Sequence, residues 1–110
     1  MNGKWVRWLH GEVKSPPMSE AARREIGYRL RELQQGIRLG LPHSRPMPGI
    51  GPHCHELRVT DATAEWRLIY RIDPLAILVL DVFGKKTRQT PQAVMENCRR
   101  RIQAYERDNP

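Results

Sequence analysis

The chain has 110 residues, which suits one domain built around one hydrophobic core, so we expect residues 1–110 to form a single domain. The formal net charge of +7 comes from an excess of arginine and lysine, and it suits a partner that is nucleic acid or an acidic protein. No apolar segment reaches the length of a signal peptide or a membrane span, which predicts a cytoplasmic protein with no membrane partner.

The first part of the chain is predicted to form a strand followed by a helix. Residues Trp5–His10 alternate between apolar and polar, which predicts a short strand. Ser15 is placed to cap the helix, Pro16 suits its first turn, and Gly36 suits its C-terminal end. One face of this helix carries the apolar residues Met18, Ala22, Ile26, Leu30 and Leu33. Their helical spacing predicts that this face packs on the core.

The second half of the chain is predicted to be mostly strand. Residues 42–52 contain four prolines and two glycines, which argues against helix and regular strand alike and predicts a surface loop. Three strand-like runs follow, at Cys54–Thr60, Glu65–Asp73 and Leu75–Phe83, and their short connections predict an antiparallel meander. Gln92–Arg107 is predicted to be a helix. Its apolar face carries Val94, Cys98, Ile102 and Tyr105.

A cluster of cations follows the last of these strands. The apolar run Leu75–Leu80 is short and rich in aliphatic residues, as is typical of a buried central strand. The strand leads through a glycine into Lys85, Lys86 and Arg88, and Pro91 then marks the start of the final helix. The basic turn is therefore held between two rigid elements, which predicts a fixed site for an anion.

Strand alternation is expected to add arginines to this site. Side chains along a strand point to alternating faces, so Arg67 and Arg71 share one face of their strand. In the strand before it, Arg58 lies on the face of Cys54 and Glu56, opposite to that of Leu57. If the register brings these faces together, the three arginines and the basic turn form a concave cationic patch. Such a patch can bind the phosphate backbone of a nucleic acid, so we expect Arg58 and Arg71 to bind RNA.

Three segments, in this order, resemble a known family. They are Glu56-Leu57-Arg58, Trp66-Arg67-Leu68-Ile69-Tyr70 and Phe83-Gly84-Lys85-Lys86-Thr87-Arg88-Gln89-Thr90-Pro91. The chain resembles the RelE/ParE superfamily of type II toxins, and within it the phage-related HigB-like branch. The resemblance implies an α+β fold, in which a curved antiparallel sheet of about four strands packs against one or more N-terminal helices and a helix ends the chain. It also implies a toxin that is neutralised by a partner antitoxin.

The resemblance implies ribosome-dependent cleavage of mRNA and thus inhibition of translation. In this reaction the ribose 2′-hydroxyl attacks the adjacent phosphate, and cations stabilise the pentacoordinate phosphate without a metal or another cofactor. Arg67 stands where such nucleases carry a phosphate-binding arginine, and Lys86 stands where they carry a second catalytic cation. Arg58, Lys85 and Arg88 are implied to hold the RNA backbone.

The chain departs from the family pattern where a general acid and base are needed. The lysines that the best-known nucleases carry before Leu57-Arg58 are replaced here by Cys54 and Glu56, and no tyrosine follows the basic turn. His53 and His55 are the candidate substitutes, because imidazole titrates near neutral pH. On a regular strand both would point to the face of Leu57 and Val59.

Several alternatives stay open at this stage. A ParE-like inhibitor of DNA gyrase, or a basic module that binds nucleic acid without catalysis, fits the same cations. The resemblance further implies an antitoxin with a HigA-like helix-turn-helix domain, together with mRNA and the ribosome as partners. His53, Cys54 and His55 are split between two strand faces and no second ligand pair exists, so we expect no metal site. Cys54 and Cys98 are expected to be reduced thiols.

Overall fold

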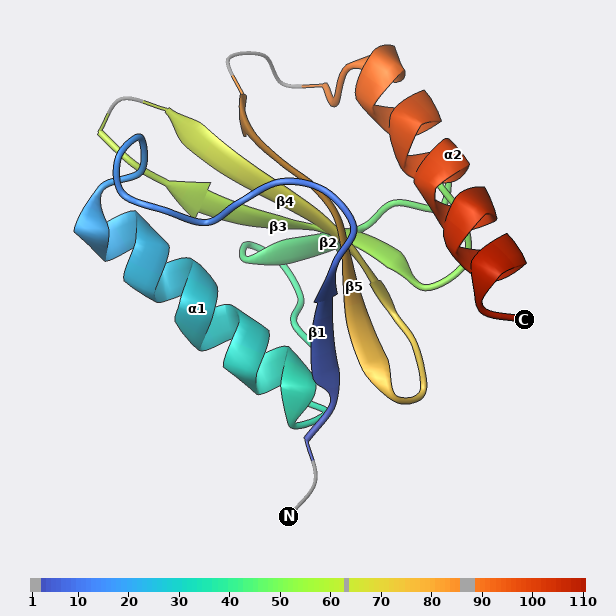
Figure 1. Ribbon diagram of the computed structural model, residues 1–110. Helices are drawn as coiled ribbons and strands as arrows, with labels where there is room; N and C mark the ends of the chain where they lie inside the picture. Colours follow the sequence, from blue (N-terminus) through green and yellow to red (C-terminus); the bar gives the residue numbers. More distant parts are fainter. Residues whose placement is uncertain (1–2, 63, 86–88) are drawn as a thin grey trace.

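The computed structural model describes residues 3–62, 64–85 and 89–110. Its elements, in chain order, are β1 (Trp5–Trp8), α1 (Glu20–Gln34), β2 (Ser44–Pro46), β3 (Cys54–Thr60), β4 (Glu65–Ile72), β5 (Ala76–Lys85) and α2 (Gln92–Asp108). The strands form one sheet in the order β1-β5-β4-β3-β2 (Figure 1). The α+β class and the C-terminal helix are therefore confirmed. Neither helix in these ranges is both long and apolar enough to cross a bilayer.

The predicted meander is confirmed, but the sheet is larger than expected and is not wholly antiparallel. Strands β3, β4 and β5 pair antiparallel in sequence order, with an irregularity at Ile69/Tyr70. The sheet has five strands rather than about four, and β1 runs parallel to β5. The alternation in Trp5–Trp8 predicted that β1 is a strand, but a local pattern carries no information about its partner or direction.

The first helix begins later than predicted. Ser19, not Ser15, is its N-cap, and the Ser19 Oγ accepts a hydrogen bond from the Ala22 amide at 3.0 Å. The Asp61 carboxylate, in the turn after β3, accepts from the Ser19 amide at 2.8 Å and from the Trp66 indole at 3.1 Å. This tertiary bond fixes the start of α1 on the β3–β4 hairpin. Gly36 follows the C-cap Gln35 with a φ of 87°, as its predicted role requires.

The proline-rich segment contains a short strand that the sequence did not predict. Ser44–Pro46 pairs with β3 as an edge strand. The amide of Met47 donates to the Cys54 carbonyl, and the amide of Arg58 donates to the His43 carbonyl. In an antiparallel pair such bonds are made by every second residue, so the main-chain groups of Ser44 and Pro46 point away from β3. Pro46 is one of these outward residues, and its missing N–H therefore removes no ladder bond.

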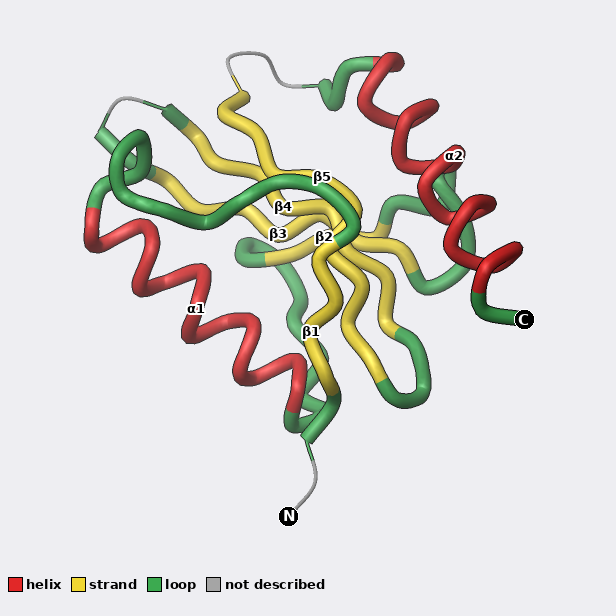
Figure 2. The backbone as a smooth tube through the Cα atoms, in the orientation of Figure 1, coloured by secondary structure: helices red, strands yellow, loops and turns green. Residues whose placement is uncertain are grey.

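Helices α1 and α2 lie on opposite sides of the sheet (Figure 2), and an apolar layer lies on each side. On one side, the predicted stripe of α1 packs on β3, β4 and β5 through Leu57, Leu68, Tyr70 and Val79. On the other side, Cys98 and Ile102 of α2 pack on part of the same strands. We call these sides the α1 face and the α2 face. The predicted apolar side of the last helix is confirmed, with Val94 and Tyr105 at its margin.

Candidate nucleic-acid interface

The pairing register brings four basic residues to the α2 face. Arg58 of β3 lies directly opposite Arg67 of β4, and Lys85 of β5 lies opposite Glu65, two residues before Arg67. Directly opposed residues in an antiparallel pair share a face, and so do residues two apart along a strand. Arg45 of β2 opposes Glu56 and joins them. We call Arg45, Arg58, Arg67 and Lys85 the cationic cluster.

Glu56 forms the buried centre of this cluster. Its side chain is fully buried, and its Oε1 accepts a hydrogen bond from the Arg45 Nε at 3.2 Å. The same oxygen lies 3.5 Å from the Arg67 Nε, and the other oxygen accepts from the Thr90 hydroxyl at 2.6 Å. Glu56 therefore joins β2, β4 and the segment before α2 at one point. A buried carboxylate held in this way fixes the positions of the arginines around it.

Arg67 lies deeper in the structure than a phosphate ligand was expected to lie. Its side chain is 2% exposed, and its Nη2 donates to the Glu65 carboxylate at 2.9 Å. Its Nε is buried without a hydrogen-bond partner, because the contact to Glu56 is an ion pair without hydrogen-bond geometry. Glu65 is half-exposed, with 49% of its side chain accessible. An anion that binds the Arg67 Nη2 therefore has to take the place of Glu65.

Lys85 has the clearest electrostatic perturbation in the cluster. Burial lowers the pKa of its ammonium group below the usual value, and Glu56 opposes this shift while the arginines of the cluster add to it. A charged lysine is disfavoured both by removal from water and by nearby positive charge. A lysine whose pKa is moved toward neutrality is a better proton donor and acceptor at physiological pH.

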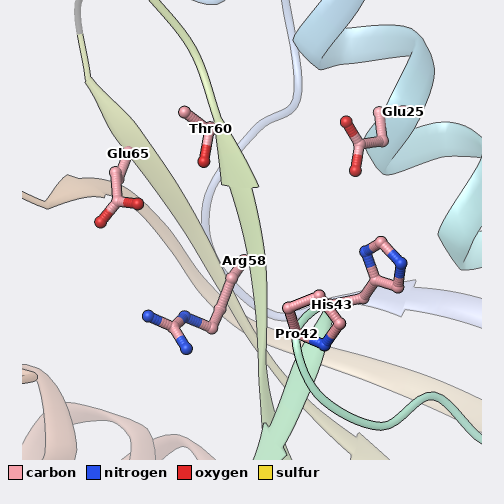
Figure 3. Close-up of a pocket in the computed structure, with 6 residues that line it drawn as sticks. All are labelled: Glu25, Pro42, His43, Arg58, Thr60 and Glu65. Carbon is pink, nitrogen blue, oxygen red and sulfur yellow. The ribbon is translucent and has the colours of Figure 1, made fainter.

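A shallow pocket of about 350 Å³ adjoins the cluster where β2 begins (Figure 3). Arg58 and Glu65 line it on one side of the β3 edge, and His43 and Glu25 line it on the other. Pro42 and Thr60 complete the lining. The accessible edge of the cluster therefore carries both an arginine and a carboxylate.

Arg71 shares the α2 face with Arg58 and Arg67, as strand alternation predicted, but it does not join the cluster. Ile69 lies between Arg67 and Arg71 along β4 and belongs to the apolar layer. The Arg71 guanidinium makes a bidentate contact with the Asp73 carboxylate, at 2.7 and 3.0 Å, and a third hydrogen bond to the Glu106 carboxylate of α2 at 3.0 Å. These bonds raise its pKa and tie α2 to the sheet. The RNA-binding role of Arg71 stays a prediction, and in this structure its guanidinium is held by Asp73 and Glu106.

The structure does not bring the two candidate histidines to the cluster. His55 lies on the α1 face, where its ring stacks on Tyr70 with centroids 5.3 Å apart, and burial lowers its pKa. His53 precedes β3 and has a φ of 62°, so the strand alternation that was expected to orient it does not apply. Its carbonyl accepts from the Ile72 amide, beside Arg71 rather than Arg67. Both residues are therefore separated from the candidate phosphate site.

Two further predicted residues, Lys86 and Arg88, lie outside the described residues. Of the basic turn, Lys85 is described, and Thr90 anchors the return of the chain through Glu56. Within the described ranges, no group of three or more histidine, cysteine, aspartate or glutamate side chains is placed to hold a metal ion. The expected free thiols, Cys54 and Cys98, are both buried under α2.

Comparison with known proteins places the chain in a family. The profile described as phage derived protein Gp49-like (DUF891) matches residues 17–103. The chain belongs to the Gp49-like family. This is a RelE-like toxin family, and the chain is a member of the RelE superfamily. No curated protein matches the chain.

The fold of this Gp49-like chain also has a solved counterpart. A double arginine-to-alanine mutant of the E. coli toxin RelE, in the free state, is similar with a TM-score of 0.59 and 16% sequence identity. The similarity covers 91% of this chain and 98% of that one. Such a match establishes a RelE-like fold, which agrees with the resemblance found in the sequence.

Sequence reasoning missed the acidic half of the site in this Gp49-like chain. Glu56 was noted as part of one family-like segment and as a departure from the family's lysines, but it was given no role in the site, and neither were Glu65, Arg45 and Thr90. Glu56 shares its strand face with the apolar Cys54 and with Arg58. A charged residue on a partly apolar face, next to an opposite charge, is a signal for a buried ion pair. Arg45 had no comparable signal, since the proline-rich segment around it was expected to be a loop.

Proposed function

We propose that this chain is the toxin of a type II toxin–antitoxin system, of the HigB-like kind, and that it cleaves mRNA on the ribosome in the cytoplasm. The observation that carries the proposal is the position of Arg58 opposite Arg67, with Lys85 on the same face and Glu56 holding the arginines in place. Preorganised cations of this kind stabilise the charge that develops on a phosphate during transfer.

The cluster supports a division of roles among its members. Arg58 is partly exposed and lines the pocket, so it meets the RNA backbone first. Phosphate then replaces Glu65 on the Nη2 of Arg67, while Glu56 keeps the guanidinium in position. Arginine suits this position because its planar fork binds two phosphate oxygens together. The 2′-hydroxyl loses its proton to solvent water and bonds to the phosphorus, which gives a 2′,3′-cyclic phosphate, and the bond to the 5′-oxygen breaks as that oxygen takes up a proton.

Lys85 is the proposed general acid of this reaction. The departing 5′-oxygen needs a proton, and the lowered pKa of the buried Lys85 makes its ammonium group a stronger acid than that of an ordinary lysine. Lys85→Arg keeps a positive charge that does not titrate. This variant is expected to bind RNA like the parent chain, to cleave it at least about a hundredfold more slowly, and to lose the parent's pH dependence in the alkaline range.

The proposed nuclease is tested by brief induction in bacteria followed by primer-extension mapping of transcripts. The parent chain is expected to arrest growth and to leave cut sites in translated regions. Arg67→Lys keeps the charge next to Glu56 but loses the fork, and it is expected to reduce cleavage at least about a hundredfold. Arg24→Ala, at an exposed position on α1, is the matched control and should leave cleavage unchanged.

Other outcomes of this experiment overturn the proposal. Growth arrest with intact transcripts and induced DNA damage indicates a ParE-like inhibitor of gyrase. Normal growth indicates a basic binding module without catalysis. The melting temperature of each variant, compared with that of the parent chain, distinguishes a loss of cleavage from a loss of the folded structure.

The antitoxin is proposed to cover the cationic cluster with an acidic segment and to carry a HigA-like helix-turn-helix domain. The net charge of +7 and the exposed side of Arg58 support an acidic partner at this site. Co-expression with the product of the adjacent reading frame should give a complex that purifies as one species and suppresses growth arrest. Independent purification of the two proteins would exclude that product as the antitoxin.

A further inference from the structure

The outer edge of β1 has the main-chain groups of a sheet edge without a partner strand. β1 is the last strand of the sheet on the side away from β2, as Figure 1 shows. The amide of Trp5 donates to the Leu75 carbonyl just before β5, and the amide of Leu9 donates to Val79 of β5. The amides and carbonyls of Val6 and Trp8 therefore point away from β5. Within the described residues, no strand pairs with this side of β1. The edge is therefore able to accept one more strand.

The beginning of this edge is closed by α1. The Lys4 amide donates to the Gln34 carbonyl at 2.8 Å, and the Gln34 side-chain amide donates to the Lys4 carbonyl at 2.8 Å. These two bonds imitate the pairing of a neighbouring strand. They leave Val6 and Trp8 as the positions at which an incoming strand would bond.

Large apolar side chains flank the edge and are exposed to solvent. Trp5 is 76% exposed, Trp8 is 46% exposed, and Leu75, next to Trp5 through a main-chain bond, is 78% exposed. Val6 and Trp8 oppose core residues of the α1 face, and Trp5 opposes Ala76 of the α2 face, so apolar surface is present on both sides of the edge. Single exposed apolar residues are common, but a group of them along an unpaired strand marks an interaction site.

A pocket of about 320 Å³ lies on the α2 side of the same edge. Its lining comes from β1, α2 and the residues just after each, and it includes Arg7, Arg101, Tyr105 and Asp108. The Arg7 guanidinium lies over the Tyr105 ring, 5.6 Å from its centroid, and it makes no ion pair within the described chain. Arg101 is already paired with Asp81 at 3.3 Å. The pocket therefore presents one unpaired arginine at the level of the strand edge.

We propose that the outer edge of β1 binds an extended acidic segment of a partner protein, which adds to the sheet as a sixth strand. Its main chain would bond to Val6 and Trp8, its apolar side chains would cover the exposed tryptophans, and a carboxylate would enter the pocket and pair with Arg7. This is recognition by strand addition, in which the main chain supplies affinity and alternate side chains supply specificity. The surface is on the opposite edge of the sheet from Arg45 and Arg58, so the inference does not depend on RNA cleavage.

The charge of the edge argues against a second copy of the chain. In the antiparallel arrangement that uses both Val6 and Trp8, the two-fold axis passes through Arg7, so two arginines face each other directly. Like charges in directly opposed positions destabilise a strand pair. The alternating amides and carbonyls also favour a peptide over single-stranded RNA, which offers stacking bases but no matching main chain.

The test uses the whole chain and short blocked peptides that alternate valine with glutamate. Binding is followed by NMR of the backbone amides and by hydrogen exchange. We expect the acidic peptide to shift the amides of Val6, Arg7 and Trp8 and to slow exchange at Val6 and Trp8 at least about tenfold. The same peptide with alternate amide nitrogens methylated cannot pair with a strand and should not bind.

Charge variants test the role of Arg7. Arg7→Glu is expected to weaken binding of the acidic peptide at least about tenfold and to favour the version of the peptide in which lysine replaces glutamate. Arg100→Glu makes the same change in charge at an exposed position of α2 and should leave binding unchanged.

Four results would overturn the inference. The first is equal binding of the methylated peptide, and the second is that the peptide shifts the amide signals of Arg58 and Lys85 instead of those of β1. The third is that, without peptide, the Val6 and Trp8 amides are protected from exchange to a degree that rises with the concentration of the chain. The fourth is that single-stranded RNA shifts the signals of Trp5 and Trp8 while the peptide has no effect. The third result indicates a second copy, and the fourth indicates RNA. Transcript mapping reports on the cationic cluster separately, so failure at β1 and failure of the proposed nuclease are distinguishable.

Discussion

The two faces of the central sheet differ in how they treat charge. Leu68 and Arg67 are neighbours on β4, yet Leu68 packs against α1 and Arg67 lies in the cationic cluster on the other face. Every charged side chain that is buried within the described residues lies on the α2 face: Glu56, Arg67, Asp81 and Lys85. The α1 face is covered by an apolar stripe along its length, whereas α2 covers only part of its own face.

This difference separates the residues that hold the sheet together from those available for chemistry. Burial of apolar surface on the α1 face stabilises the fold without specifying any ligand. Burial of charge on the α2 face opposes folding unless each group is paired, and such pairing is weak evidence for a role in stability. Perturbed titratable groups collect at functional sites, and Lys85 with its arginine neighbours fits that pattern. The two faces should therefore respond differently to mutation.

The largest expected contrast is between the neighbours on β4. Leu68→Ala leaves a cavity under α1, and it is expected to lower the free energy of unfolding by about 2–5 kcal/mol while the folded fraction keeps its cleavage activity. Arg67→Lys is expected to do the reverse, with cleavage lost and most of the stability kept. Urea denaturation and transcript mapping on both variants measure the contrast. Equal loss of activity in both would show that the faces are not functionally distinct.

A smaller loss of stability is expected from the centre of the cluster. Glu56→Gln keeps the shape of the side chain and a bond from Thr90, but it removes the charge that Arg45 and Arg67 contact. We expect a decrease of about 1.5–3 kcal/mol in the free energy of unfolding, the range for hydrogen bonds to charged groups. Glu96→Gln, at an exposed position of α2, is the control and should change the unfolding midpoint little.

A gain in RNA binding is expected when the competing carboxylate of Arg67 is neutralised. Glu65→Gln weakens the hold on the Arg67 Nη2, and it should raise the affinity for a short RNA by a few fold, with a steeper dependence on salt. Filter binding at several salt concentrations measures both quantities. Glu106→Gln makes the same change beside Arg71 and should not alter RNA binding. A decrease in affinity in Glu65→Gln would mean that Glu65 itself contacts the RNA.

The smallest effect concerns the two thiols in the apolar half of the α2 face. Burial raises the pKa of Cys98 from 9.0 to about 12 and that of Cys54 from 9.0 to about 11. Because the folded chain favours the protonated thiols, their contribution to stability is complete below pH 9 and is lost as the pH rises through these values. At pH 8, iodoacetamide should label both residues slowly until urea unfolds the chain. Rapid labelling of the folded chain would show that α2 opens readily.

Particular residues show which parts of this fold local patterns predict. The stripe from Ala22 to Leu33, the meander of β3 to β5 and the apolar face of α2 follow from periodicity, because the period of a helix or strand is set by its own backbone. The start of α1 does not follow from periodicity. Ser15 and Ser19 are both acceptable caps, and the bond from the Ser19 amide to Asp61, distant in sequence, favours Ser19.

The candidate site was predicted in the same uneven way. Strand alternation placed Arg58 and Arg67 on faces that can coincide, and the register then paired them as expected. Alternation also suggested that Arg71 joins them and that His53 and His55 share a face. The carboxylates of Asp73 and Glu106 hold Arg71, and the backbone at His53 leaves the strand conformation. Such partners come from other elements, so no local pattern reveals them.

The sequence by itself determined the order of most elements and the excess of positive charge, since each depends on residue type and short-range spacing. Its ordered segments resembled a family, and that resemblance implied the α+β class. Tertiary structure alone decided that β1 lies parallel to β5 with its outer edge unpaired, that β2 forms within the proline-rich segment, and that Glu56 and Glu65 hold the guanidinium of Arg67. These features depend on contacts between residues far apart in the chain, and such contacts exist only after the sheet has chosen its register.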